Sequence, residues 1–433
     1  MPEHEFNEVL GLGKMKGFKT LAGVSEALER FRKAVVHRIE EAEEVELMDA
    51  LGRICAEDVK AVMDVPPYDR SAVDGYAIIA EDVFSASPMN PIKLKLVGKI
   101  LTGSTPSTIP RIERGEAVEI MTGAPMPLNA NAVVMVEDVK IVENGIEVLK
   151  PVHPYQNVSR RGEDFKRGEI VIKRGVKVKP WHIGALASLN IGKLKVLRRP
   201  RISVLSTGDE LIEFGEELKP GKIINSTKPM LMALLLEEGC IPLDLGIAGD
   251  DVDEIYSKIL TGLRKSDGVI VTGGTSVGVK DLVPEAVKRL GEIVFHGLRM
   301  RPGKPTGAAV SAGKPIFMLS GFPVAAAIGF EVLVRPILAH MQRCMIEPRP
   351  KIRGIITRRV VNPPNTRSYV RVRVFESDDK VMVEPLRLTG SGILSSLTRG
   401  NGLLIIPEEL EGYDEGDIVE VELLQPIWRG DEK

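Results

Sequence analysis

Apolar residues recur at helical spacing near the start of the chain. Between residues 25 and 44 they form one stripe, made of Ala27, Leu28, Phe31, Val35 and Ile39. An apolar residue every three or four positions is typical of an amphipathic helix, and a serine just before such a stripe is a favourable N-cap. The pattern therefore predicts a helix over Ser25–Glu44 that is capped by Ser25.

The next stretch, from about residue 45 to 195, has short apolar runs separated by Gly and Pro turns. Runs with high β-propensity occur at Ile92–Val97, Ala117–Met121 and Ala132–Val136, and the turns include Asn144-Gly145. Strands this short, joined by tight turns, are typical of antiparallel sheets rather than of βαβ units. This stretch therefore predicts a mostly antiparallel β domain.

After Arg198-Arg199-Pro200 the apolar runs alternate between strand and helix lengths. The predicted strands are Ile202–Ser206, Pro242–Ile247, Gly268–Thr272, Ile293–Phe295 and Ile316–Leu319, and the predicted helices are Met230–Glu238, Asp253–Lys265, Pro284–Leu290 and Val324–Met341. This alternation predicts a mostly parallel sheet with helices on both faces. Beyond Pro348-Arg349-Pro350 the spacing returns to period two at Ser368–Phe375 and Val381–Pro385, which predicts further β-structure.

Composition narrows the class of protein. A length of 433 residues suggests about three domains, and the net charge of -2 excludes a strongly basic, nucleic-acid-coating protein. The first residues are acidic where a signal peptide is basic, and the longest apolar stretch, Val324–Ala339, is interrupted by Glu331 and Arg335. The three cysteines are too widely spaced for a zinc site or a disulfide framework. We expect a cytoplasmic protein without a membrane or nucleic-acid partner.

Polar, Gly-rich loops follow five of the predicted strands. They are STGDE (206–210), GDD (249–251), TGGTSVG (272–278), RPGKP (301–305) and SGFP (320–323). Ligands bind parallel sheets beyond the carboxyl ends of the strands. Glycine-rich turns let backbone N–H groups converge on an anion, and carboxylates such as Asp209, Glu210 and Asp250 suit Mg²⁺. The five loops predict a site for a phosphate-bearing ligand held with Mg²⁺.

Simpler explanations apply to some of these residues. Asp251, followed three residues later by Glu254, equally fits a capping box, and Asp281 can cap the helix that follows it. Lys304 is different, because a proline on each side restricts the loop and presents the cation in one direction.

The β region has polar loops of its own. Asp74-Gly75 fits a tight turn, Met121–Pro125 fits an ordinary β-turn, and Arg160–Asp164 fits a solvated charged turn. Taken one at a time, these segments do not require a functional explanation.

Seven short motifs, taken in order, resemble the molybdopterin molybdenumtransferase family, which comprises the bacterial MoeA proteins and the C-terminal domain of gephyrin. The motifs are SAVDGYA (71–77), MTGAP (121–125), RRGED (160–164), STGDEL (206–211), GGTSVG (273–278), PGKP (302–305) and GSGILSSLTRGN (390–401). The resemblance implies Mg²⁺-dependent insertion of molybdate into adenylylated molybdopterin with release of AMP. It also implies a homodimer that receives its substrate from a molybdopterin adenylyltransferase.

The family fold implied by this resemblance has four parts. They are an elongated linker domain (19–59 and 168–199), an inserted β domain (60–167), an α/β molybdopterin-binding domain (200–345) and a C-terminal β-barrel (346–433). The N-terminal helix either is part of the linker domain or packs on the α/β domain. The family's ligand cleft forms where the α/β and barrel domains of one subunit face the β domain of the other.

The resemblance also assigns roles to residues. The expected catalytic residues are Asp74, Thr122, Asp164, Glu210, Asp250 and Asp281, of which Asp250, Asp281 and Glu210 are expected to hold Mg²⁺. The expected pterin- and anion-binding residues are Thr207, Gly208, Gly273, Gly274, Ser276, Gly278, Arg301, Pro302, Gly303, Lys304, Ser320, Pro323, Arg371 and Ser391.

Three positions depart from the family pattern. Phe322 replaces a polar amide, Arg301 replaces the usual lysine before PGKP, and Gly297 stands at a position that is often lysine. These changes raise the hypothesis of a tungstate preference. The alternative functions are molybdopterin adenylylation, which needs only an α/β unit like residues 200–345, and a gephyrin-like scaffold that binds partner peptides.

Overall fold

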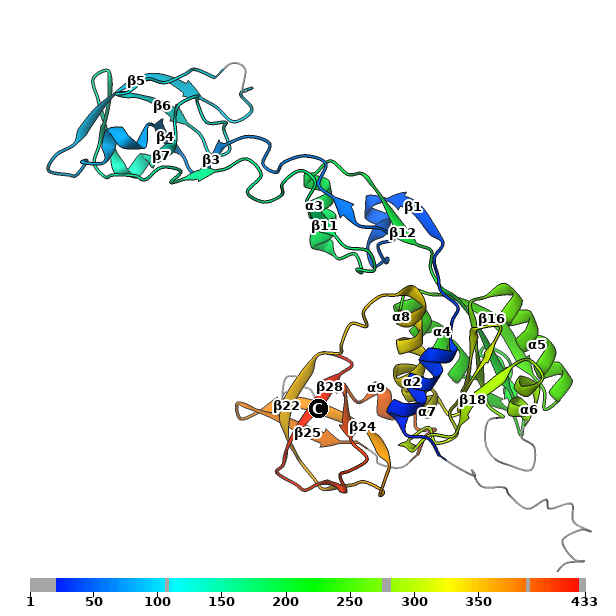
Figure 1. The fold of residues 1–433 in the computed structure, drawn as a ribbon. Coiled ribbons are helices and arrows are strands. Elements are labelled where there is room, and N and C mark those ends of the chain that lie inside the picture. The colour runs from blue at the N-terminus through cyan, green and yellow to red at the C-terminus, as the bar shows by residue number, and fades with distance from the viewer. Residues whose placement is uncertain (1–20, 106–108, 275–281, 387–389, 428–433) are drawn as a thin grey trace, which may run out of the picture. The chain divides into compact units, whose positions relative to one another are not determined.

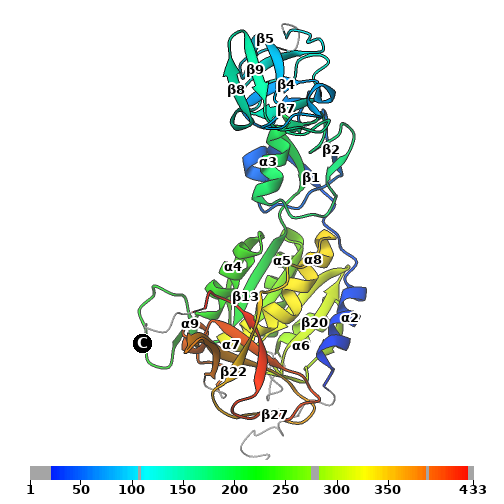
Figure 2. The same ribbon diagram turned by 90° about the vertical axis from the view of Figure 1, so that its left-hand side faces the viewer.

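The computed structural model describes residues 21–105, 109–274, 282–386 and 390–427. The chain forms two compact units (Figure 1, Figure 2). One contains the chain up to Glu43 and from Leu197 onward, and the other is Glu44–Val196. The fold class agrees with the sequence prediction, since the chain combines an α/β domain with β domains.

The N-terminal helix is shorter than predicted. Helix α2 spans Val24–Ala34, its N-cap is Gly23 rather than Ser25, and no side chain caps it. The prediction was wrong at the C-terminal end of the helix. Val35 and Ile39 lie after the helix but are still buried, so the apolar stripe in the sequence continues beyond the helix itself. The backbone N–H of Ile39 donates to the carbonyl of Met341 at 2.9 Å, so this segment is fixed by tertiary contacts.

The α/β sheet has the strand order β16-β13-β17-β21-β20-β18. Its strands are β13 (Arg201–Thr207), β16 (Ile241–Ala248), β17 (Gly268–Thr272), β18 (Glu292–His296), β20 (Gly307–Ser311) and β21 (Lys314–Leu319). Only β20, which the sequence pattern missed, runs antiparallel to its neighbours. Because β18 is antiparallel to β20 and β20 to β21, β18 runs in the same direction as the other four strands.

Helices cover both faces of this sheet (Figure 1). They are α4 (Thr227–Glu237), α5 (Val252–Lys265), α6 (Leu282–Lys288), α7 (Pro323–Gly329), the π-helical segment η5 (Phe330–Val334) and α8 (Arg335–Gln342). One core joins α2, α4 and α7–α8 to the sheet, with Phe31 edge-to-face against Phe295 and Phe317. A second core lies under α5 and α6.

The continuous helix Pro323–Gln342 is long and apolar enough to span a membrane, with a mean hydropathy of 1.5. In this fold 67% of that window is buried inside the protein. Its two interrupting charges are paired, since Arg335 Nε lies 2.7 Å from Glu238 and Arg349 Nη2 lies 2.5 Å from Glu331. The composition is therefore that of a core helix.

The C-terminal strands close into a barrel. In the order β24-β25-β22-β28-β26, the last strand pairs back onto the first. The elements are β22 (Lys351–Ile356), β23 (Val360–Val361), β24 (Arg367–Ser377), β25 (Lys380–Pro385), α9 (Ser395–Thr398), β26 (Gly402–Ile406), β27 (Gly412–Tyr413) and β28 (Ile418–Leu423). Inward-facing residues such as Val372, Val374 and Val421 form its core.

The second unit contains a six-stranded sheet of order β7-β4-β6-β5-β9-β8. Its strands are β4 (Gly75–Ile78), β5 (Ile92–Ile100), β6 (Glu116–Ile120), β7 (Ala132–Met135), β8 (Val139–Val142) and β9 (Gly145–Val148). All its pairings are antiparallel except β5 with β6, which confirms the predicted sheet type. Separate apolar clusters contain Tyr76 and Ile78 on one face and Ala77 on the other.

Smaller elements complete this unit. They are β1 (Ala42–Glu46), η1 (Leu47–Ala50), β2 (Val59–Lys60), β3 (Arg70–Ser71), η2 (Ala80–Val83), η4 (Val136–Asp138), β10 (Val158–Ser159), β11 (Ile170–Ile172), α3 (Pro180–Ser188) and β12 (Lys193–Leu197). Strand β1 pairs with β12, and β2 pairs with β11. The core beside them contains Cys55, Leu186 and Val196.

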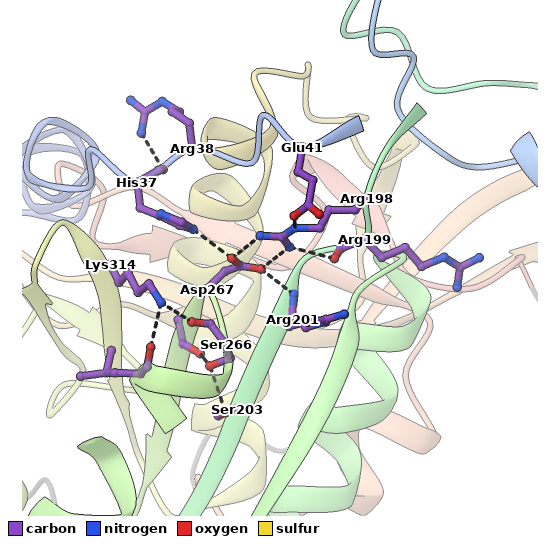
Figure 3. A network of polar contacts seen from close by, with 12 residues as sticks. His37, Arg38, Glu41, Arg198, Arg199, Arg201, Ser203, Ser266, Asp267 and Lys314 are labelled. Carbon is purple, nitrogen blue, oxygen red and sulfur yellow. Dashed lines mark hydrogen bonds and ion pairs between the residues drawn. The ribbon is translucent and has the colours of Figure 1, made fainter. Parts of the chain in front are cut away.

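A buried carboxylate, Asp267, organises the edge of the α/β sheet where its parallel strands begin (Figure 3). It is only 4% exposed and accepts two hydrogen bonds from Arg198, at 2.7 and 2.8 Å. The backbone N–H of Arg201 and His37 Nε2 complete its shell at 2.8 and 2.9 Å. Arg198 also pairs with Glu41 at 2.7 Å. Glu41 lies just before β1, and Arg198 lies just after β12. The network therefore fixes the two points where the chain leaves and re-enters the unit that contains the α/β sheet.

This network makes the protein sensitive to acid. Burial alone would raise the pKa of Asp267, but the hydrogen bonds from Arg198, Arg201 and His37 lower it to about 2. A carboxyl whose pKa is depressed in the folded state stabilises above its unfolded pKa, and this contribution disappears as the pH falls from about 4 to about 2. The shift corresponds to about 2 kcal/mol of stability at neutral pH.

We expect Asp267→Asn to lower the free energy of unfolding at pH 7 by about 3 kcal/mol, because the Arg198 guanidinium loses its buried charge partner and keeps only the exposed Glu41. Denaturant melts of both proteins at pH 7, 4 and 2.5 should show the difference narrowing as the pH falls. Asp253→Asn is the matched control, since the side chain of Asp253 is 83% exposed and pairs with Arg289 at the surface. A difference that stays constant from pH 7 to 2.5 would contradict this assignment.

Candidate functional site

The five loops singled out in the sequence do open on one edge of the α/β sheet. Each follows the carboxyl end of a strand, and β13, β16, β17, β18 and β21 all run in the same direction. The Asp267 network lies at the opposite ends of these strands. The sheet therefore places the predicted ligand loops together, as its parallel topology requires.

Three of the loops meet without room for side chains. A Cβ on Gly273 would lie 2.4 Å from the carbonyl oxygen of Thr207, and one on Gly274 would lie 2.9 Å from Thr207 Oγ1. A Cβ on Gly321 would lie 3.3 Å from Gly273 Cα. Glycine is therefore required for the loops to approach this closely. Gly208 adds to the cluster, since its backbone N–H donates to Ala248 at 3.0 Å.

The loop after β18 is joined directly to the barrel. Strand β19 (Met300–Arg301) pairs in parallel with the start of β24, with Arg301 opposite Ser368. Between them lies a cavity of about 290 Å³. Its lining comes from both domains and comprises Met300, Arg301, Pro302, Gly303, Lys304, Pro305, Val360, Val361, Ser368, Tyr369, Val370, Arg371, Gly390 and Ser391.

Three cationic side chains line this cavity: Arg301, Lys304 and Arg371. Arg371 is only 3% exposed and donates from Nε to Ser396 Oγ at 3.2 Å and from Nη1 to the Tyr369 carbonyl at 3.2 Å. Burial, and then the nearby charge of Arg301, lower the pKa of Arg371. Like charges held together in a partly enclosed cavity favour an anion that neutralises them.

The shape of the PGKP loop explains its glycine. Gly303 has φ of +107°, and a Cβ there would lie 2.4 Å from Met300 Cε. The turn is closed by the backbone N–H of Thr306, which donates to Gly303 at 2.9 Å. Thr306 is fully buried, and its hydroxyl has no hydrogen-bond partner in the part of the chain that the structure describes.

The predicted carboxylates occupy the neighbouring loops. The Glu210 carboxylate folds over Gly208, where a Cβ would lie 2.4 Å from its Oε2. Asp209 Oδ1 accepts from the backbone N–H of Asp250 at 3.0 Å, which ties these two loops together. Asp251 has the capping role, since its side chain accepts from Glu254 N at 2.7 Å at the start of α5.

Some predicted ligand residues, namely Ser276, Gly278 and Asp281, lie outside the described residues. Within the described ranges, no group of three or more His, Cys, Asp or Glu side chains is placed to hold a metal ion. Glu210 and Asp250 have the right donor chemistry, but the described residues alone do not make a Mg²⁺ site.

The remaining predicted residues of this edge lie in the loop after β21. Ser320 is 5% exposed, and its hydroxyl accepts from the backbone N–H of Phe322 at 3.2 Å. Pro323 is the first residue of α7. The next backbone N–H, that of Val324, donates to the Ser391 carbonyl at 3.0 Å. The loop after β21 is therefore hydrogen-bonded to the barrel loop that lines the cavity.

Two predicted residues of the β domain are in contact. Asp74 Oδ1 accepts from both the backbone N–H and the hydroxyl of Thr122, at 2.7 and 2.8 Å. These two hydrogen bonds lower the pKa of Asp74. The third predicted residue, Asp164, has its backbone N–H bonded to the Val65 carbonyl at 3.0 Å.

Sequence reasoning missed some residues of these regions. Ser368 and Tyr369 line the cavity, but in the sequence they are part of an ordinary β-strand pattern. Asp64 was also missed, although it accepts from Arg161 Nε at 2.6 Å and from the Arg167 backbone at 2.9 Å. The sequence signal for Asp64 is the charged RRGED segment (160–164), because its arginines need an acidic partner elsewhere in the chain.

Comparisons with known proteins cover almost the whole chain. Family models match residues 22–190 ("MoeA N-terminal region (domain I and II)"), 203–340 ("Probable molybdopterin binding domain") and 353–424 ("MoeA C-terminal region (domain IV)").

The molybdopterin molybdenumtransferase of Bacillus subtilis is 34% identical over 89% of this chain and 90% of its own length. A Methanocaldococcus jannaschii protein assigned provisionally to molybdopterin biosynthesis is 43% identical over 88% of this chain and 92% of its own length. The crystal structure of the molybdopterin biosynthesis protein MoeA from Pyrococcus horikoshii OT3 superposes with a TM-score of 0.81 at 33% identity, covering 93% of this chain and all of that one. On this evidence the chain belongs to the MoeA family of molybdopterin biosynthesis proteins.

Proposed function

We propose that this protein is a molybdopterin molybdenumtransferase and that the cavity between the PGKP loop and β24 receives the metal oxyanion. The observation that carries the proposal is the set of three cations, Arg301, Lys304 and Arg371, on one cavity that two domains build together. Molybdate and tungstate are tetrahedral dianions. They can accept charge-assisted hydrogen bonds from each of these side chains and from the Ser391 hydroxyl.

The pterin substrate fits the adjoining surface. The glycine loops around Gly273 and Gly321 approach each other closely at the sheet edge where a phosphate-bearing ligand is expected. The hydrogen bond between Val324 and Ser391 joins these loops to the rim of the oxyanion cavity. A ligand with its phosphates on the glycine loops and its reacting end at the cavity would meet both requirements of the insertion reaction. Release of AMP from an adenylylated substrate is part of this proposal.

Magnesium is also part of the proposal. It would neutralise phosphate charge beside Asp250 and Glu210, and its remaining protein ligand would have to come from Asp281, outside the described residues. The chain's own contribution at this point is to position two carboxylates, through the Asp209–Asp250 contact and the folding of Glu210 over Gly208.

The Asp74–Thr122 pair lies in the other compact unit. We propose a homodimer in which this pair, with Asp164, completes the cleft of the partner subunit. We also propose that the protein is cytoplasmic and that a molybdopterin adenylyltransferase delivers its substrate.

The two alternative functions explain less of the chain. An adenylyltransferase would need only the α/β unit and would leave the barrel half of the cavity unexplained. A scaffold would not need three cations around one cavity. Incubation with molybdopterin, ATP and Mg²⁺ distinguishes the adenylyltransferase from the proposed function. Efficient adenylylation without metal insertion would exclude a molybdenumtransferase. Retention of receptor-like peptides without oxyanion turnover would support the scaffold.

The oxyanion proposal predicts a charge-specific loss of binding. We expect Lys304→Met and Arg371→Met each to weaken molybdate binding, measured by calorimetry, by about tenfold or more, because each removes a charge-assisted hydrogen bond. Arg373→Met is the matched control, since Arg373 lies two residues along the same strand but pairs with Glu384 at 2.7 Å instead of lining the cavity. Lys304 is exposed, so its variant separates lost binding from lost folding. Equal affinity in all four proteins would exclude this cavity as the oxyanion site. Tungstate in the same titrations tests the metal preference.

The shared cleft predicts complementation between two inactive variants. Asp74→Ala and Lys304→Met should each lower molybdate-dependent AMP release, whereas Glu143→Gln, in an exposed turn, should not. When the two inactive proteins are unfolded, mixed and refolded together, about a quarter of the wild-type activity should return, because half of the dimers are mixed and each of these has one intact site. Mixed dimers as inactive as their parents would contradict the shared cleft.

A further inference from the structure

Phe322 is an exposed aromatic side chain at the ligand edge of the α/β sheet. It is 59% exposed, although the residues that follow Pro323, from Val324 to Ala326, are fully buried. It stands in the loop after β21, between the glycine cluster and the barrel loop that carries Ser391. None of the apolar core clusters formed by the described residues of this unit includes Phe322.

The loop around Phe322 is held rigidly. Its backbone N–H donates to Ser320 Oγ at 3.2 Å, and its carbonyl accepts from Ala326 N at 2.9 Å. The preceding Gly321 carbonyl accepts from Thr227 Oγ1 at 2.7 Å. These hydrogen bonds fix the backbone of Phe322 before any ligand binds, which reduces the backbone entropy lost on binding.

One side of the ring is supported by the barrel. A Cβ at Gly392 would lie 3.1 and 3.5 Å from ring carbons Cδ1 and Cε1, so glycine lets the barrel loop pack against the phenyl group. The same loop supplies Ser391 to the oxyanion cavity. The ring thus stands beside the phosphate loops and next to the rim of the cavity, with most of its surface free.

We propose that Phe322 is a specificity-determining residue that stacks on a planar heteroaromatic ring of the substrate. This inference rests on the proposed function, whose substrate carries two such rings, the pterin and the adenine of its adenylyl group. An exposed, backbone-fixed phenyl ring beside anion-binding loops can hold a charged ligand by its flat ring, because stacking needs no matched hydrogen bonds. The side chain thereby fixes the orientation of the ligand between the glycine loops and the cavity.

The test compares ring-bearing probes with ring-free ones. Dissociation constants are measured for AMP, 6-hydroxymethylpterin, ribose 5-phosphate and molybdate with wild-type protein, Phe322→Leu and Phe322→Tyr. We expect Phe322→Leu to weaken one ring-bearing probe by about tenfold and Phe322→Tyr to change it by less than about twofold. Loss of AMP binding alone assigns the ring to adenine, and loss of pterin binding alone assigns it to the pterin. Ribose 5-phosphate and molybdate should bind all three proteins alike.

Phe84→Leu is the control for loss of an exposed phenyl ring elsewhere, since Phe84 is 53% exposed in the other unit. Unchanged AMP and pterin affinities in Phe322→Leu would overturn the inference while leaving the proposed function intact. Failure of wild-type protein to bind molybdate would instead overturn the proposed function, whatever the ring-bearing probes show. Because Phe322 is exposed, we expect its substitution to leave folding intact. Thermal melts of each variant check that a loss of binding is not caused by a loss of folding.

Discussion

The candidate site depends on a two-residue strand pairing. When β19 joins β24, the loop that carries Arg301 and Lys304 is fixed against the strand that carries Arg371. The pairing holds like charges close together, and burial, followed by the nearby charge of Arg301, lowers the pKa of Arg371. The barrel and the α/β domain are each built on an apolar core, which supports this pairing from both sides.

The two edges of the α/β sheet have different roles. At the carboxyl ends of the strands, glycines let the loop backbones approach one another closely. At the amino ends, Asp267 is fully satisfied by Arg198, Arg201 and His37, and its ion pairs tie down the chain next to β1 and β12. One edge is thus closed by internal polar contacts, whereas the other carries the glycine loops and the cation-lined cavity proposed to bind substrate.

The sequence predicted local features better than long-range ones. Strand β17 begins and ends at the predicted residues, because a short apolar run between polar loops is unambiguous. Strand β20 was missed, since its small residues Gly307–Ser311 carry little β-propensity. Helix α2 is shorter than predicted, because Ile39 is buried by tertiary contacts and yet has the spacing of a helical apolar residue. The β19–β24 pairing could not be predicted, since a two-residue strand has no periodicity and its partner lies more than sixty residues away. Motif resemblance therefore singled out Arg371 as a candidate, but only the structure places it in the same cavity as Arg301.

The most direct measurement of the central claim is anomalous X-ray scattering from crystals soaked in tungstate. The account predicts a tungsten peak inside the cavity, within contact of Lys304, Arg371 and Ser391, and no such peak in crystals of Lys304→Met soaked at the same concentration. A tungsten atom bound elsewhere in wild-type crystals, with this cavity left empty, would contradict the account.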